Sequence, residues 1–301
     1  MAYRISTDRS NKTLQKEIKR IAREQIDKAI GEIDNDGLAL DTTVHQVRKR
    51  CKKIRGLIRI VRPEFDAHDS ENAFFRDAAK SLSDLRDAQV MIDTYDSLMA
   101  AFDDQIKRST FAPIRRALTL RRQRMAGHEV ESRQQLALFR EAMQEAEKRT
   151  DSWLLAARGF AAVEGGLQKT YRRARKGMKK AYAGAPRAEL FHEWRKRVKY
   201  HRYHLRLLRP LWPPVIEIYW QQAKDLSDLL GDEHDLAVLQ QTLKNHPDEF
   251  ANIEALSAFM GLIKQRRTQL QRQAKGAGER LLAEKPKQLS RRLKKYWKSD
   301  R

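Results

Sequence analysis

Two segments of the chain carry histidine and basic residues at helical spacing. The first set consists of His45, Arg48, Lys52, Arg55, Arg59 and Arg62, and the second of His192, Arg195, Lys199, Arg202, Arg206 and Arg209. Steps of three and four residues place each set on one face of an α-helix. Arginine offers paired donors that match phosphate oxygens, and lysine adds a point charge. The spacing therefore predicts two cationic stripes, each able to contact a polymer of phosphate groups.

The two stripes belong to an internal repeat. The segments 44–65 and 191–212 align without a gap at an offset of 147 residues, and nine of their 22 positions are identical. The identical residues are one histidine, seven basic residues and one proline, whereas the apolar residues differ between the copies. A duplication kept only for its fold would be expected to keep the apolar pattern first. The repeat therefore indicates that the cations themselves have a function.

Each stripe runs beside a row of apolar residues that predicts a buried helix face. The rows consist of Val44, Val47, Cys51, Ile54, Ile58 and Val61 in the first copy, and of Phe191, Trp194, Val198, Leu205 and Leu208 in the second. His201 interrupts the second row. Like charges four residues apart destabilise a helix, so an ordinary solvated face would carry interspersed acids. The alternative to an anion-binding stripe is a solvated basic face, or arginines that pair with acids from other helices. The retention of the cations in both copies of the repeat favours anion binding.

The amino-acid composition limits which classes of protein this chain can belong to. Lys and Arg number 62 against 40 Asp and Glu, a net charge of +22, which predicts an anionic polymer or surface as the partner. Hydrophobic residues make up 41 %, enough for a folded core. The single cysteine, Cys51, favours a reducing compartment. The first ten residues lack the apolar stretch of a secretory signal, and no apolar run is long enough to span a bilayer, so we expect a soluble cytoplasmic protein.

Strong helix formers dominate, and no alternating strand pattern occurs, which predicts an all-α fold. We expect about eight major helices, four before Asp151 and four after it, with 110–151 as one long amphipathic helix and breaks at Gly165-Gly166 and Gly231-Asp232. The string Leu-Ser-Asp-Leu at 82–85 recurs at 226–229, and each copy is followed by an aspartate motif, at Asp87 and Asp235. The repeated motifs therefore predict a single domain, 1–301, with related halves 1–150 and 151–301.

Further basic clusters lie outside the stripes. One opens the second half and includes Tyr171, Arg172 and Arg175. Supporting basic residues occur on other predicted helices, at Lys16, Arg20, Arg23, Arg116 and Arg267. Each cluster alone is typical of a solvated face. Together with the stripes they predict a basic groove or channel between the two halves.

The paired His-x-x-Arg motif, given twice, resembles the CHAD family, the histidine-containing α-helical domain. The Tyr-Arg-Arg-x-Arg segment at Tyr171 and the Asp87 and Asp235 motifs fit as well, so that the resemblance covers about residues 10–285. It implies two four-helix bundles related by an approximate two-fold around a basic channel that binds inorganic polyphosphate, with association to polyphosphate granules. By motif position it implies ligand contacts at His45, Arg48, Lys49, Lys52, Arg55 and Arg59, and at His192, Arg195, Lys196, Lys199, Arg202 and Arg206. The second copy departs from the first at Tyr200, where the first has Lys53, and at His201.

The sequence also bears on enzymatic activity, metal binding and nucleic-acid binding. Neither a P-loop nor a Gly-x-Gly-x-x-Gly motif occurs, nor the alternating-glutamate motif of the triphosphate-hydrolysing domain found in some family members, so we expect no enzymatic activity and no cofactor. A metal site at His201, His204 and His234 is conceivable but lacks the spacing of known ligand sets. Sequence-independent nucleic-acid binding remains the alternative, without a recognisable reading motif. His45 and His192 either gain a proton when a polyanion binds or are neutral hydrogen-bonding residues.

Overall fold

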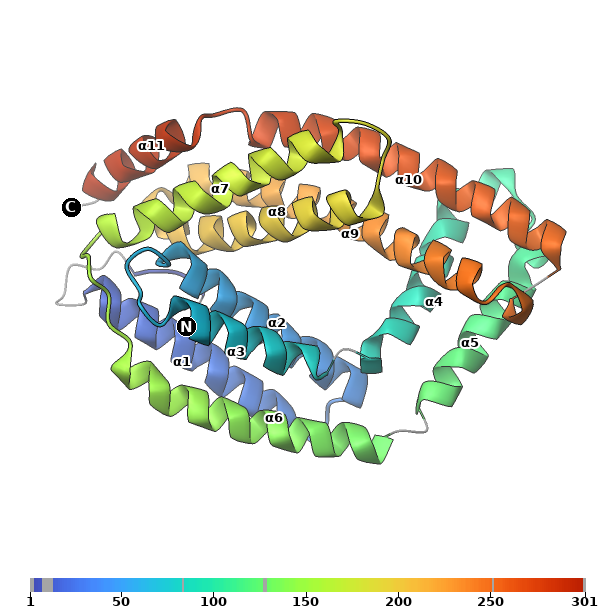
Figure 1. The fold of residues 1–301 in the computed structure, drawn as a ribbon, viewed down its shortest axis with the longest axis horizontal. Coiled ribbons are helices and arrows are strands. Elements are labelled where there is room, and N and C mark those ends of the chain that lie inside the picture. Colours follow the sequence, from blue (N-terminus) through green and yellow to red (C-terminus); the bar gives the residue numbers. More distant parts are fainter. Residues whose placement is uncertain (1–2, 7–12, 83, 127–128, 251, 300–301) are drawn as a thin grey trace.

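The computed structural model describes residues 3–6, 13–82, 84–126, 129–250 and 252–299, except for the side chains of 84–87, 125, 126 and 129. Within these ranges the chain forms α-helices joined by short 3-10 turns, without strands (Figure 1). The all-α prediction is confirmed. No helix among these residues combines the length and the apolar character needed to cross a membrane.

More helices form than the sequence predicted. The described part of the first half contains α1 (Leu14–Ile33), α2 (Leu40–Ile60), α3 (His68–Lys80), α4 (Asp84–Ala101), α5 (Ala112–Ala126) and α6 (Glu129–Arg149). The second half contains α7 (Ala161–Ala181), α8 (Ala188–Leu208), α9 (Pro213–Asn245), α10 (Ile253–Leu281) and α11 (Pro286–Ser299). The expectation of one helix over 110–151 is wrong, because α5 packs on α4 whereas α6 packs on α1. Gly127, a poor helix former, falls between them in the sequence.

The predicted breaks at two glycine positions are also wrong. Gly165 and Gly166 lie inside α7, and Gly231 lies inside α9. Gly166 marks a close approach instead of a turn, because a Cβ there would overlap the carbonyl oxygen of Ile60 on α2. Glycine at this position lets α2 and α7 come within contact distance. A Cβ at Gly231 would lie 3.6 Å from the guanidinium of Arg195, which is an ordinary contact distance.

The predicted apolar rows are confirmed as buried faces of α2 and α8. Val44, Val47, Cys51 and Ile54 are fully buried, and the corresponding residues of α8 are buried as well. His201 is as buried as its apolar neighbours, and its ring meets that of Tyr171 edge-on at a centroid distance of 5.0 Å. The row on α8 is therefore continuous, with an imidazole in place of one hydrocarbon side chain.

Apolar side chains gather in two clusters, and each cluster draws on both halves of the sequence. The first lies among α1, α2, α3 and α6 and includes residues of α7, α8, α11 and the beginning of α9. The second lies where α4 and α5 meet the end of α9 and the first part of α10, at the right of Figure 1. The halves therefore share their cores.

Helices α2 and α8 meet at equivalent positions of the repeat. A Cβ at Gly56 would lie 3.0 Å from the Cβ of Tyr203, and the offset between these two residues is the 147 residues that separate the two copies. The imidazole Nε2 of His204 lies 3.1 Å from the carbonyl oxygen of Gly56. This crossing fixes how the two stripe-bearing helices lie relative to each other.

The buried histidines predict a loss of stability in acid. His201 and His204 are 1 % and 0 % exposed, and burial lowers the pKa of His201 to about 4 and that of His204 well below its usual value. In the unfolded chain both would titrate near 6.5, so the stability that they confer is complete above pH 6.5 and is lost as the pH falls toward 4. For His201 the shift corresponds to on the order of 3 kcal/mol.

Urea denaturation at a series of pH values measures this effect. The free energy of unfolding should fall between pH 7 and pH 5, and a His201→Phe variant should show a shallower fall, because its side chain cannot take up a proton. Identical pH profiles for the variant and the wild type would contradict this account.

Candidate anion-binding site

The first stripe runs along the side of α2 that is turned toward α3. Arg48 donates from Nη1 to the carbonyl oxygen of Leu82 at 2.9 Å, and Arg55 donates from Nε to Oδ1 of Asn72 on α3 at 3.3 Å. His45, Arg48, Lys52 and Arg55 are partly exposed, and Lys49 is exposed. Arg48 and Arg55 therefore each donate to a neutral acceptor while they remain partly exposed.

The second stripe lies between α8 and α9, and carboxylates of its surroundings neutralise part of it. Arg202 lies 3.6 Å from Asp228, and Arg209 lies 2.5 Å from Glu217. Lys196 forms an ion pair with Glu193 on its own helix. The alternative that arginines pair with acids of other helices therefore applies to these two arginines.

Two further stripe arginines form cation–π contacts with aromatic side chains. The guanidinium of Arg59 lies over the ring of Tyr200 at 4.2 Å, and that of Arg206 lies over Trp220 at 5.1 Å. Arg59 is only 8 % exposed. Burial lowers its pKa to about 10, as it does that of Arg62, and neighbouring guanidinium groups contribute to both shifts. The last turn of the first stripe is therefore a strongly positive and partly dry region.

Histidine and arginine meet in the first turns of the second stripe. The Nδ1 atoms of His192 and His234 lie 3.1 Å apart, and the two rings lie 4.1 Å apart. Burial is the largest cause that lowers the pKa of each ring to about 4, and nearby Arg195 and Lys196 add to it. Both imidazoles are therefore neutral at pH 7, and one donates to the other. Arg195 lies against Gly231 of α9.

The cluster at the start of the second half divides between core and surface. Tyr171 is 1 % exposed, and its hydroxyl donates to the carbonyl oxygen of Leu281 at 3.3 Å. Burial raises its pKa to about 12. It occupies the apolar face of α7, so it ties α7 to α10 and is not open to a ligand. Arg172 is exposed and Arg175 is partly exposed.

Most supporting basic residues have structural partners. Arg20 pairs with Glu17 at 2.8 Å, and Arg23 pairs with Asp151, which ties α1 to the segment after α6. Arg267 donates to the buried carboxylate of Glu233 at 2.7 Å. Two remain exposed, Lys16 on α1 and Arg116 on α5. The structure therefore does not gather this set into the stripes, since three of its five members are held by carboxylates elsewhere.

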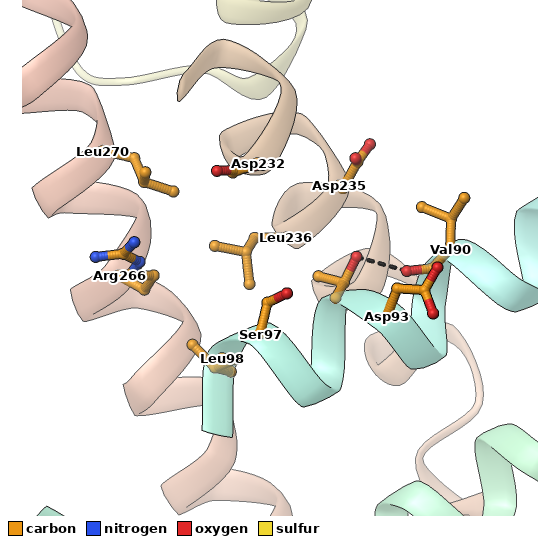
Figure 2. A pocket seen from close by; sticks show the side chains of 10 residues that line it. Val90, Asp93, Ser97, Leu98, Asp232, Asp235, Leu236, Arg266 and Leu270 are labelled. Carbon is orange, nitrogen blue, oxygen red and sulfur yellow. Dashed lines mark hydrogen bonds between the residues drawn. The ribbon is translucent and has the colours of Figure 1, made fainter. Parts of the chain in front are cut away.

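An acidic hollow of about 230 Å³ lies between α4, α9 and α10. Figure 2 shows Asp232 and Asp235 on α9 and Asp93 on α4, with Arg266 of α10 on the opposite wall. Burial and the neighbouring Asp235 raise the pKa of Asp232. Asp235 belongs to the second aspartate motif, whereas the side chain of Asp87 lies outside the described residues. Carboxylates repel polyanions, so this hollow is not part of the cationic surface.

Metal-binding geometry is absent from the described residues, which contain no group of three or more His, Cys, Asp or Glu side chains that could hold an ion. The three histidines considered for a metal site have different surroundings in the structure. His201 and His204 lie in the core, and His234 is bonded to His192.

Comparisons with known proteins agree with this architecture. The family model described as CHAD domain matches residues 12–244. The chain belongs to the CHAD domain family. A crystal structure of the CHAD domain from the plant Ricinus communis is similar to this CHAD domain, with a TM-score of 0.61, 16 % sequence identity and 89 % coverage of each chain. At that identity the likeness concerns the fold. No curated protein matches the sequence.

Two arginines of the CHAD domain that were not predicted as site residues lie beside the first stripe. Arg173 and Arg197 influence both Arg59 and Arg62 electrostatically, which places them in the same region. Arg197 belongs to the repeat, so its identity in both copies was an available signal.

The basic helix α11, whose exposed cations are Lys287, Arg291, Lys294, Lys295 and Lys298, lies beyond the matched segment.

Proposed function

We propose that this CHAD domain binds inorganic polyphosphate along the stripes of α2 and α8, and that it associates with polyphosphate granules. The observation that carries the proposal is the duplicated set of cations on two helices that meet at equivalent positions, Gly56 and Tyr203. A contact between equivalent positions is expected where a two-fold axis relates two copies. We infer that the halves are related in this way and that the stripes border one basic channel.

The spacing of the cations suits a thin phosphate polymer. At a rise of about 1.5 Å per residue, steps of three and four place successive cations about 5–6 Å apart along each helix. A chain with phosphate at every unit can meet each cation in turn. The aromatic rings beside the stripes, Tyr200 and Trp220, are covered by Arg59 and Arg206. They are therefore not free to stack on nucleobases, which nucleic-acid binding without sequence preference commonly uses.

A competition measurement tests the proposal against its main alternative. At physiological salt, long-chain polyphosphate should bind at least about tenfold more tightly than duplex DNA at matched phosphate concentration, because Tyr200 and Trp220 beside the stripes are covered by arginines while phosphate contacts remain. Both affinities should fall with salt, as counterion release requires. Equal or reversed affinities would favour a sequence-independent nucleic-acid-binding protein.

The proposed activity is binding without hydrolysis. Phosphoryl transfer commonly depends on metal ions that neutralise charge in the transition state, and the stripes consist of cations and histidines. The phosphate of a bound chain would therefore be held without a group arranged to cleave it. Metal-dependent phosphate release that persists through purification to homogeneity would contradict this part of the proposal.

A further inference from the structure

Four arginines converge where α2, α7 and α8 pack together, and they are called here the arginine nest: Arg59, Arg62, Arg173 and Arg197. Arg62 donates from Nη2 to the hydroxyl of Thr170 on α7 at 2.7 Å and from Nε to the carbonyl oxygen of Arg59 at 3.0 Å. Thr170 and Arg173 are three residues apart on α7, so they share a face. Arg173 therefore stands one turn from the residue that holds Arg62.

The other side of the nest is built in the same way on α8. Arg59 stacks on Tyr200, and Arg197 lies three residues before Tyr200 on the same face of that helix. Arg197 has one carboxylate partner, Glu193, at 3.0 Å, which also pairs with Lys196. Arg59, Arg62 and Arg173 form no ion pair with any carboxylate in the described part of the chain.

Arg59 is the unusual member of the nest. It is more than nine-tenths buried, and among the described residues its Nε has no hydrogen-bond partner. A buried cation that lacks both an acid and full hydrogen bonding is costly, and proteins avoid it unless a further group is supplied. The ring of Tyr200 offsets only part of that cost, because a cation over an aromatic face is a weaker partner than a carboxylate or phosphate. The missing partner has the character of an anion.

The equivalent positions in the other half lack this feature. Arg209, the equivalent of Arg62, pairs with Glu217. Arg50, the equivalent of Arg197, donates from Nε to both oxygens of Glu32 at 3.1 and 3.2 Å. Carboxylates thus pair with Arg209 and Arg50, whereas Arg62 pairs with none in the described part of the chain and Arg197 shares Glu193 with Lys196, so the repeat alone does not explain the nest.

We propose that the arginine nest is a discrete site for one terminal phosphate group, taken either from the end of a polyphosphate chain or from free pyrophosphate. A terminal group carries more charge and more free oxygens than a group within a chain, and several guanidinium groups gathered in one region match it. The stripe along α2 would bind the body of a chain, and the nest at its last turn would bind the end. This inference rests on the proposed function only in that Arg59 and Arg62 also belong to the first stripe.

Calorimetry with pyrophosphate and the full chain tests the proposal. The wild type should show a single saturable site. A variant with Arg62→Gln and Arg173→Gln should bind pyrophosphate at least about tenfold more weakly, because it loses two charge-assisted contacts. The control combines Arg115→Gln with Arg140→Gln, which removes the same charge from two exposed arginines that pair with Asp96 and Asp34. The control should bind pyrophosphate as the wild type does.

A matched pair of single variants sharpens the result. Arg197→Gln should weaken pyrophosphate binding, whereas Arg50→Gln, at the equivalent position in the other copy, should not. Circular dichroism should show all variants helical. Full pyrophosphate affinity in the folded Arg62/Arg173 variant would overturn the proposal.

The outcomes also separate this proposal from the proposed function. If long chains bind but pyrophosphate does not, the nest is no terminal site and the stripe hypothesis stands. If pyrophosphate binds at the nest but long chains do not, the proposed function fails and the nest stands. If the control variant loses as much pyrophosphate affinity as the nest variant, only net charge matters and the nest proposal is overturned.

Discussion

Reversal of Lys52 and Arg55 to glutamate is expected to weaken the binding of long-chain polyphosphate by about 100-fold or more, since charge-assisted contacts of about 1.5–3 kcal/mol each are replaced by repulsion. Both residues lie on the accessible part of the first stripe, within one turn of each other. Arg59 is unsuitable for this test because it is buried. The apolar face of α2 is unchanged, so the fold should persist. Fluorescence anisotropy with labelled polyphosphate at fixed salt measures the loss.

The control is the same double reversal at Arg121 and Arg122 on α5. These residues lie outside the stripes, and adjacent positions on a helix point about 100° apart, so they cannot both face one line. Arg121 pairs with Glu249 at 3.2 Å, and Arg122 bonds to Gln89 at 2.7 Å. The change in net charge is identical, so nonspecific attraction weakens equally in both variants. Equal losses of affinity in two helical proteins would show that only net charge matters.

The periodicity of the sequence predicted which residues share a face within a single helix. Steps of three and four residues correctly separated the buried row at Val47 and Cys51 from the cations beside it. Tyr171 was assigned to the candidate site from the basic cluster around it and not from this spacing, whereas its own position on α7 belongs to the apolar face. Local spacing decides which residues share a face, and the packing of other helices decides whether that face meets solvent.

Features that depend on distant segments could not be read from the sequence. Asp228 and Glu217 neutralise Arg202 and Arg209 because α9 folds back along α8, and no rule of spacing connects these residues. The burial of Arg59 likewise follows from how closely α2, α7 and α8 pack. The repeat made the stripes look equivalent, and the carboxylates of α9 that pair with Arg202 and Arg209 lie outside the repeated segments.

The close packing of α2 and α7 explains why glycine stands in the middle of a helix. A Cβ at Gly166 would overlap the carbonyl oxygen of Ile60 and lie 2.5 Å from that of Arg59, and both are backbone atoms that cannot rotate away. Next to it, Gly165 faces Pro63, whose Cγ would lie 2.8 Å from an added Cβ. The contact holds the last turn of α2 against α7, where Arg62 reaches Thr170. Stability and site geometry therefore depend on the same pair of surfaces.

Gly166→Ala is expected to lower the free energy of unfolding by about 3–5 kcal/mol, since a methyl group forced against backbone ranks among the most destabilising substitutions. Gly261→Ala is the matched control, because Gly261 also lies inside a long helix, α10, and has no atom within 4 Å of an added Cβ. There alanine should stabilise the protein by about 0.5–1 kcal/mol through its higher helix propensity. Urea denaturation at pH 7 measures both changes, which should have opposite signs. If Gly166→Ala unfolds within about 0.5 kcal/mol of the wild type, the range typical of a neutral surface change, then α2 and α7 separate at little cost, and the packing that orients Arg59 and Arg62 is looser than the structure indicates.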